Sequence, residues 1–196
     1  MKLRVALFTL LLAAGTASAA AAFPIALPGT EGFTVIVNGN SSIVATYQGN
    51  SAAYSNDLYL MLLSNGLPGD DGNTANDLFI FNNHTSLVGS TVDLGTFLIG
   101  TELEFRLHVN NTGYDYFTGP ASRNPDQHFH ARVDSSFGPN ETLVSFEDLY
   151  NGPFDYNDLS FSFTNTNSAP ATAPEPASMV LVGTALAGWV ARRRMR

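Results

Sequence analysis

Four carboxylates and one amide lie close together in the segment FEDLYNGPFDYNDLSF, residues 146–161. The five side chains are those of Glu147, Asp148, Asp155, Asn157 and Asp158. No Lys or Arg occurs between Arg132 and Arg192 to neutralise them. Calcium binds roughly six to eight oxygen ligands, so a loop that brings these side chains to one point would supply most of a Ca²⁺ site. The alternative is an acidic turn that is exposed to water.

The same carboxylates raise the question of general acid–base catalysis. A glycosidase needs two carboxyl groups that flank one bond, roughly 5 to 9 Å apart. Glu147 and Asp148 are adjacent, so on a strand their side chains face opposite sides and do not form this pair. A pair of Glu147 with Asp155 or Asp158 stays open. The sequence contains no nucleophile elbow, phosphate loop or HExxH motif, and it therefore favours a non-enzymatic protein.

A second oxygen-rich loop, LPGDDGNTANDLFIF at residues 67–81, is another candidate for an ion site. Its oxygen-bearing side chains are those of Asp70, Asp71, Asn73, Asn76 and Asp77. The spacing differs from the EF-hand pattern, because Gly72 comes too early and no Glu follows. Loops rich in Gly and Asn are usually turns, and we expect that role here.

Two histidines, His128 and His130, are separated by a single residue. On a strand both imidazoles would point to the same face, but zinc needs a third or fourth ligand. Nothing in the spacing places His84 or His108 nearby. Surface or structural histidines are therefore the favoured interpretation.

Short runs rich in Val, Ile, Phe, Tyr and Thr must position these loops. Nine such runs predict strands, at residues 32–39, 42–48, 57–64, 76–83, 90–100, 102–110, 128–134, 142–149 and 158–166. The expected fold is all-β, an antiparallel β-sandwich of jelly-roll type over residues 23–165. The triplet Asn-Asp-Leu begins at Asn56, Asn76 and Asn157, each time before an apolar run, which we attribute to the preference of Asn and Asp for turns.

The N-terminus has the three parts of a secretory signal peptide. A basic start with Lys2 and Arg4 precedes an apolar run over residues 5–14, and an Ala-x-Ala cleavage signal ends at Ala19. Cleavage after Ala19 or Ala22 would release the mature chain outside the cytoplasm. We therefore predict a signal peptide over residues 1–22.

The C-terminus has a polar spacer, an apolar run and a basic end. Residues 166–173 have the small, Pro-containing composition of a linker. The triplet Pro174, Glu175 and Pro176 then precedes an apolar run over residues 177–191, and the basic end consists of Arg192, Arg193, Arg194 and Arg196. The run is shorter than the roughly 20 residues that span a bilayer comfortably, and its arginines would stay on the cytoplasmic side.

The triplet, the apolar run and the basic end occur in the same order as in the PEP-CTERM sorting tail of exported bacterial proteins. Residues 174–196 therefore resemble this tail. The resemblance implies a single apolar helix, transient anchoring in the inner membrane, and removal of the tail by an exosortase-type membrane protease. The alternative is a simple single-pass anchor.

The region between signal peptide and tail is strongly acidic. It contains three arginines, no Lys and sixteen acidic residues, which corresponds to a net charge of about −13. Nucleic acid and anionic membrane surfaces are repelled by such a chain, whereas cations are attracted. The sequence also has no Cys, so disulfides do not stabilise the exported chain, and a bound metal would be a natural substitute.

The segment LVSFEDLYNGPFDYNDLSFSF looks like the signature of a domain of unknown function common in calcium-rich bacterial surface proteins. In that family an Asn-x-Asp and a His precede the signature, which matches Asn124, Asp126 and either His128 or His130. The resemblance implies that Asp126 is a further metal ligand. One position departs from the pattern, because Pro153 stands where the family has another Asp.

These features favour an exported, non-enzymatic protein of the cell surface or the extracellular matrix, stabilised by Ca²⁺. By resemblance, proteins with this tail belong to bacteria that make exopolysaccharide, so exopolysaccharide is an expected partner and a biofilm an expected location. A lectin-like carbohydrate-binding module is the alternative, since Tyr114, Tyr116 and Phe117 would stack on sugar rings if they are exposed.

Overall fold

The computed structural model describes residues 22–171 of the chain, which form strands, two short 3₁₀ helices and loops. None of the helices in this range is long and apolar enough to cross a membrane. The predicted signal peptide, the apolar tail helix and the sorting motif lie outside the described residues.

Within residues 22–171 the chain forms strands that are short and closely spaced. They are β1 (Phe33–Val37), β2 (Ile43–Asn50), β3 (Asn56–Leu60), β4 (Leu78–Asn82), β5 (Thr91–Gly95), β6 (Glu102–Leu103), β7 (Phe105–Val109), β8 (Asp115–Phe117), β9 (Ala131–Gly138), β10 (Glu141–Phe146), β11 (Leu159–Thr164) and β12 (Thr166–Pro170). The 3₁₀ helices are η1 (Thr74–Asn76) and η2 (Ala121–Arg123).

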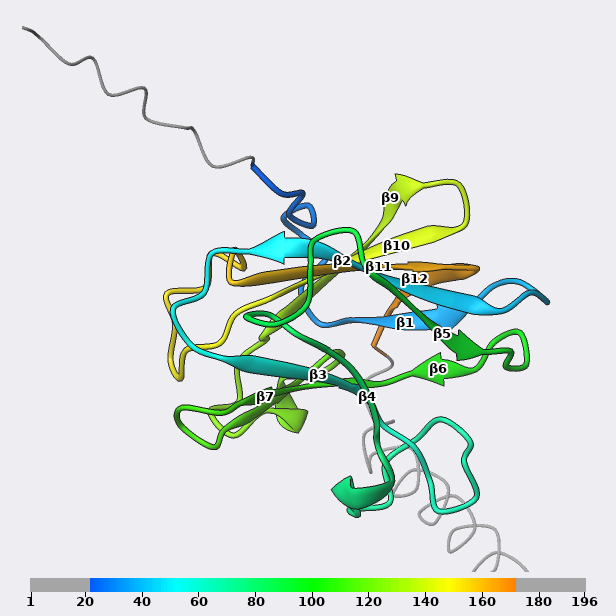
Figure 1. Cartoon of the computed structure of the whole chain (residues 1–196), viewed down its shortest axis with the longest axis horizontal. Coiled ribbons are helices and arrows are strands. Elements are labelled where there is room, and N and C mark those ends of the chain that lie inside the picture. The colour runs from blue at the N-terminus through cyan, green and yellow to red at the C-terminus, as the bar shows by residue number, and fades with distance from the viewer. Residues whose placement is uncertain (1–21, 172–196) are drawn as a thin grey trace, which may run out of the picture.

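The strands form three antiparallel sheets, in the orders β5-β2-β11-β10-β9, β4-β3-β7-β8 and β12-β1-β6. Figure 1 shows β2, β10 and β11 in the upper layer and β3, β4 and β7 in the lower layer. Aromatic rings meet between the layers, with centroids 4.1 Å apart for Phe105 and Phe163 and 6.0 Å apart for Phe81 and Phe161. The predicted all-β antiparallel fold is confirmed.

The two-residue period of the strands explains how these layers form a core. Along β2, buried and half-buried residues alternate, and Ile43, Ala45 and Tyr47 point into the core. The central strand β11 is buried on both faces, because the N-terminal segment covers its outer side. There the Ala26 amide donates to Ser145 Oγ (2.8 Å), which contacts Ser160 Oγ (2.8 Å).

The structure differs from the predicted strands in several places. The run 102–110 is divided, because the chain passes at Glu104 from the sheet of β1 to the sheet of β3. β9 begins only at Ala131, so His128 and His130 precede it rather than lie on it. β8 was not predicted, because its three residues are too short for a recognisable period.

The predicted linker over 166–173 is wrong for its first five residues. Thr166–Pro170 is β12, which pairs with β1 from Phe33↔Pro170 to Val37↔Thr166. Small polar residues and Pro have weak strand preference, and here the pairing partner decides the conformation. Proline is tolerated because it ends an edge strand.

Candidate metal centre

Three of the predicted acidic side chains meet in the structure. One carboxylate oxygen from each of Glu147, Asp148 and Asp158 lies within 4.8 Å of the others. Glu147 and Asp148 directly follow the last residue of β10, and Asp158 directly precedes the first residue of β11. Because Phe146 pairs with Leu159 in the antiparallel ladder, the two acidic stretches come together beyond this pair. We call Glu147, Asp148 and Asp158 the acidic triad.

The expectation that Glu147 and Asp148 face opposite sides is wrong. It assumed that both residues lie on a strand, whereas β10 ends at Phe146. Beyond that residue the chain leaves the regular alternation, and both carboxylates approach Asp158.

Two members of the triad are nearly closed to water, Asp158 is half-buried, and the hydrogen bonds of the triad are incomplete. Glu147 is 1% exposed and Asp148 is 4% exposed. The Asp148 amide donates to Asp158 Oδ2 (2.8 Å), and the Leu149 amide donates to Glu147 Oε1 (3.3 Å). Glu147 Oε2 is buried and has no partner among the described residues. A buried carboxylate oxygen without a partner is costly, so this atom indicates a missing ligand.

Burial and nearby negative charge shift the pKa values of Glu147 and Asp148. Burial, reinforced by the charge of Asp158, raises the pKa of Glu147 to about 8. Burial also raises the pKa of Asp148 to about 6, although a hydrogen bond from Asn56 opposes the shift. Both shifts express mainly the cost of burying a carboxylate, to which the charge of Asp158 adds.

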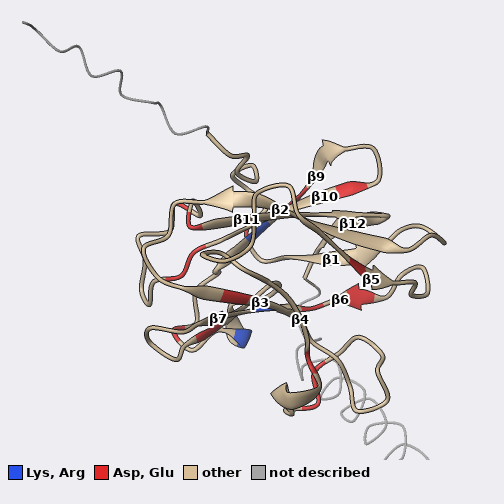
Figure 2. Cartoon of the chain, viewed as in Figure 1, with Lys and Arg blue, Asp and Glu red and all other residues tan. Residues whose placement is uncertain are grey.

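The arginines of the described region do not compensate the triad. They pair with other acids, at N–O distances of 2.7 to 3.2 Å: Arg106 with Asp77 and Asp115, Arg123 with Glu102 and Glu104, and Arg132 with Glu31. Figure 2 shows the same imbalance, with red segments in both layers and few blue ones. The described chain therefore supplies no Lys or Arg as counterion to the triad.

The facing sheet also contributes a residue that was not predicted, Asn56 at the start of β3. Its Nδ2 donates to Asp148 Oδ2 (2.8 Å), and its Oδ1 is buried without a partner in the described residues. The repeated Asn-Asp-Leu triplet was the available signal, since Asn56 opens the first copy and Asp158 belongs to the third. The preference of Asn and Asp for turns does not account for this contact.

Two further candidates, Asp155 and Asn157, lie outside the triad. Asp155 is exposed, and its Oδ2 accepts a hydrogen bond from Asn157 Nδ2 (2.7 Å). Asn157 Oδ1 accepts from Ser51 Oγ (2.9 Å). The charge of Asp155 nevertheless contributes to the raised pKa of Glu147, so it lies near enough to interact with the triad through space.

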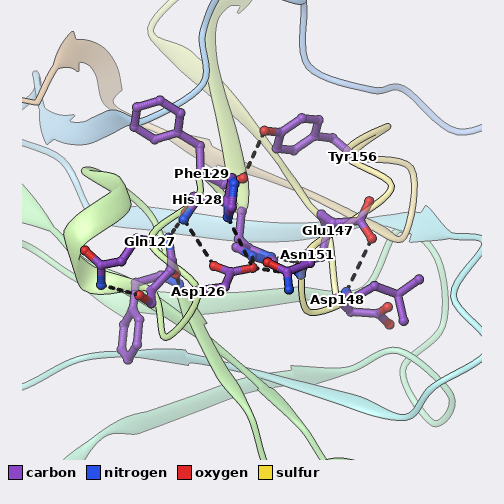
Figure 3. Close-up of polar contacts among 12 residues, drawn as sticks. Asp126, Gln127, His128, Phe129, Glu147, Asp148, Asn151 and Tyr156 are labelled. Atoms are coloured by element: carbon purple, nitrogen blue, oxygen red, sulfur yellow. Dashed lines mark hydrogen bonds and ion pairs between the residues drawn. The ribbon is translucent and has the colours of Figure 1, made fainter.

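Asp126 also lies outside the triad and ties two loops together (Figure 3). Its Oδ2 accepts from His130 Nε2 (2.9 Å) and from the Asn151 amide (2.9 Å), and its Oδ1 accepts from the His128 amide (3.1 Å). Burial opposes ionisation, but the hydrogen bonds from Asn151 and His130 outweigh it and lower the pKa of Asp126. Asp126 thus fastens the acidic segment to the loop before β9.

A second contact fastens the acidic segment on its other side. Tyr156 donates its hydroxyl to the Phe129 carbonyl (2.9 Å), as Figure 3 shows, and the Arg132 guanidinium lies 4.2 Å above its ring. Tyr156 has a positive φ of 57°, an unfavourable conformation for a bulky residue. The surrounding contacts hold the segment in this conformation next to the triad.

His130 has a structural role, whereas His128 is exposed. His130 is fully buried, stacks on Tyr116 at a centroid distance of 3.8 Å, and contacts the Glu147 carbonyl through Nδ1 (2.9 Å). Both of its ring nitrogens are therefore engaged. Among residues 22–171, the metal-binding group of three or more side chains contains acids and no histidine.

The second oxygen-rich loop uses its side chains for turns and one ion pair. Asp70 and Asp71 accept hydrogen bonds from the Gly72 and Asn73 amides, and Asp71 also accepts from Ser64. Asp77 accepts from the Leu62 amide and pairs with Arg106 (3.0 Å). The expected turn role agrees with these contacts.

The fold and the triad define the described region as an all-β domain with a candidate metal centre. Residues 172–194 match the PEP-CTERM protein-sorting motif. The motif implies an exported cell-surface protein that is processed by an exosortase. This match covers the tail alone and gives no support to the resemblance of the acidic segment to a calcium-type domain. No curated protein and no solved structure matches the chain.

Proposed function

We propose that this exported chain is a non-enzymatic cell-surface or extracellular-matrix protein whose β-domain binds Ca²⁺ at Glu147, Asp148 and Asp158. The observation that carries the proposal is the buried, unpartnered Oε2 of Glu147 in a group of three acids with no arginine beside it. A cation would satisfy this atom and remove the repulsion among the three carboxylates.

The donor atoms favour a hard cation. The triad offers carboxylate oxygens and neither nitrogen nor sulfur, which suits Ca²⁺ or Mg²⁺ better than zinc. Asp155 and Asn157 lie in the same segment and, with water, would complete the larger coordination sphere that Ca²⁺ prefers. We therefore assign Ca²⁺ rather than Mg²⁺.

The bound ion would act as a clamp between strands. It would join the end of β10 to the start of β11, and Asn56 connects Asp148 to β3 in the facing sheet. The chain has no Cys, so such a clamp would take the place of a disulfide. The near-complete burial of Glu147 and Asp148 keeps a polymeric substrate away from both carboxylates, which supports a structural role over catalysis.

The test is thermal unfolding of the full chain in detergent, with Ca²⁺ and with a chelator. A ligand in hundredfold excess over its Kd stabilises the folded state by about 2.7 kcal/mol, so Tm should rise clearly with Ca²⁺. Asp158→Asn keeps an acceptor for the Asp148 amide but removes the charge, and it should abolish most of this rise. Mg²⁺ at equal ionic strength should have a smaller effect.

The matched control is Asp71→Asn, an exposed acid in the other oxygen-rich loop. It should respond to Ca²⁺ like the wild type. Equal responses in wild type and Asp158→Asn would refute the triad as the site, and loss of response in Asp71→Asn alone would place the ion in the loop at 67–81.

A further inference from the structure

A second candidate site lies beside the β7–β8 turn. It is a cleft of about 480 Å³, within the usual range for small-ligand sites, and Tyr114, Asp115, Phe117, Arg123 and Gln127 are among its lining residues. We propose that this cleft binds a neutral saccharide, with the Tyr114 ring as the surface on which a sugar ring stacks. The proposal goes beyond the calcium-stabilised role and does not depend on it.

Tyr114 is an exposed aromatic ring in a fixed position. It is 41% exposed, and it stacks on Tyr150 with ring centroids 5.1 Å apart and an interplanar angle of 25°. Tyr150 does not line the cleft, so it supports Tyr114 from outside. The backbone is also held, because the Val109 amide donates to the Tyr114 carbonyl (2.9 Å). An aromatic ring held in this way presents an apolar surface to the C–H face of a sugar.

The structure corrects the group of aromatics that the sequence suggested. Tyr116 is fully buried against His130, and Phe117 is half-buried. Tyr114 is the exposed member of the predicted three, and Tyr150, from the acidic segment, is its unpredicted partner.

Oxygen atoms around the cleft suit the hydroxyl donors of a sugar. Asp115 uses Oδ1 for Arg106 Nη1 (2.8 Å) and His108 Nδ1 (2.9 Å), which leaves Oδ2 for a ligand. Gln127 donates from Nε2 to the Asn124 carbonyl (3.0 Å), which leaves Oε1. A saccharide offers several hydroxyls that can donate to such acceptors.

Electrostatics exclude an anionic ligand in this cleft. Arg123 is the cation among its lining residues, and its guanidinium is paired with Glu102 (2.8 Å) and Glu104 (3.2 Å). The described chain as a whole carries three arginines against sixteen acids. A nucleotide or a uronic acid polymer would therefore be repelled, whereas a neutral sugar would not.

None of the residues given above as lining the cleft belongs to the acidic triad. The Asn151 amide, next to Tyr150, donates to Asp126 Oδ2 (2.9 Å), a contact that involves no triad residue. Sugar binding and calcium binding can therefore fail separately in an experiment.

The test is isothermal titration of the full chain, in a detergent without sugar groups, with neutral oligosaccharides derived from cellulose, laminarin, starch, xylan and dextran. Polygalacturonate serves as the anionic comparison. We expect saturable binding of at least one neutral oligosaccharide, with and without chelator, and about tenfold weaker binding by Tyr114→Ala. Tyr114→Phe should retain most of the affinity, and Phe79→Ala, which removes an exposed aromatic on β4, should retain all of it.

Circular dichroism of each variant distinguishes a loss of binding from a loss of folding. If Tyr114→Ala does not fold, Gln127→Ala replaces it and should also weaken binding. Absence of saturable binding to every neutral oligosaccharide, or unchanged affinity in a folded Tyr114→Ala, would overturn the proposal. Preferential binding of polygalacturonate would overturn it as well.

Discussion

At Glu147, burial, charge and hydrogen bonding conflict more than at the other triad residues. The side chain is 1% exposed, lies with Asp148 and Asp158, and leaves one carboxylate oxygen without a partner. Without a cation the residue can relieve this conflict by taking up a proton. The raised pKa of Glu147, about 8, expresses that response.

This conflict predicts how stability depends on pH. The pKa values of Glu147 and Asp148 rise from 4.5 and 3.8 to about 8 and about 6. Because they are higher in the folded chain, their contribution to stability is fully present below about pH 4 and is lost as pH rises toward 8. In chelator, Tm should therefore fall across this window, and Ca²⁺, which binds carboxylates, should reduce the fall. Calorimetry at a series of pH values measures both curves.

The pH effect has a specific control at Glu104. Burial raises the pKa of Glu104 to about 7, which contributes with the same sign. Glu104→Gln should remove its own part of the pH dependence and leave the effect of Ca²⁺ unchanged. A Tm that rises with pH in chelator would contradict the pKa shifts of all three groups.

A substitution at Glu147 should affect stability differently with and without Ca²⁺. Glu147→Gln resembles the protonated carboxyl, so at neutral pH in chelator the free energy of unfolding should change little. With Ca²⁺ the same variant lacks one charged ligand, and most of the calcium-induced rise in Tm should disappear. Thermal scans with and without chelator provide the comparison. A variant that is equally destabilised in both conditions would indicate an ordinary packing role for Glu147.

At the scale of elements, strands within longer runs of β-branched and aromatic residues were recognised, whereas the three-residue β8 and the polar β12 were not. β2 and β11 contain alternating apolar and polar residues, and β1 is rich in β-branched residues, so these strands are visible in the sequence. β8 and β12 become strands because β7 and β1 offer an edge for pairing. Such pairing leaves almost no mark in a stretch as short as β8 or as polar as β12.

The assignment of β12 as part of the folded domain can be tested at Thr166. This residue is buried, and its hydroxyl contacts the Phe163 carbonyl (2.7 Å) and Thr142 Oγ1 (2.9 Å). Thr166→Val keeps the shape but leaves both partners unpaired, so it should cost about 1 to 3 kcal/mol in urea unfolding. Ser168→Ala, at a half-buried position on the same strand, should cost less. An unaffected Thr166→Val variant would mean that residues 166–170 behave as a linker.

At the scale of the whole molecule, charge is divided between an acidic region and a basic end. The described region holds sixteen acids and three arginines, whereas four arginines lie within the last five residues. The acidic region would attract cations, and the basic end would orient the tail in a membrane. The match of residues 172–194 to the sorting motif agrees with this division.

Deletion of Arg192–Arg196 tests the role of the basic end. Without these charges the tail should lose its hold on the cytoplasmic side, so unprocessed chain should leave the membrane fraction. Fractionation and immunoblotting against the wild type measure processing and location. Replacement of the four arginines by Lys, which preserves the charge, should restore retention. Normal processing of the deleted chain would argue against the arginines as a retention signal.

The sequence by itself determined the local features of this protein: alternating strands, the acidic segment at 146–161, the net negative charge and the sorting tail. These depend on residue type and on spacing over a few positions, which periodicity and charge report directly. Tertiary structure alone decided that Glu147 and Asp148 meet Asp158, and that Asp126 contacts His130 instead. It also decided that Asn56 contacts Asp148 at the metal centre and that Tyr150 stacks on Tyr114 beside the cleft. Contacts between distant segments depend on strand register and on the paths of loops, which no local pattern encodes.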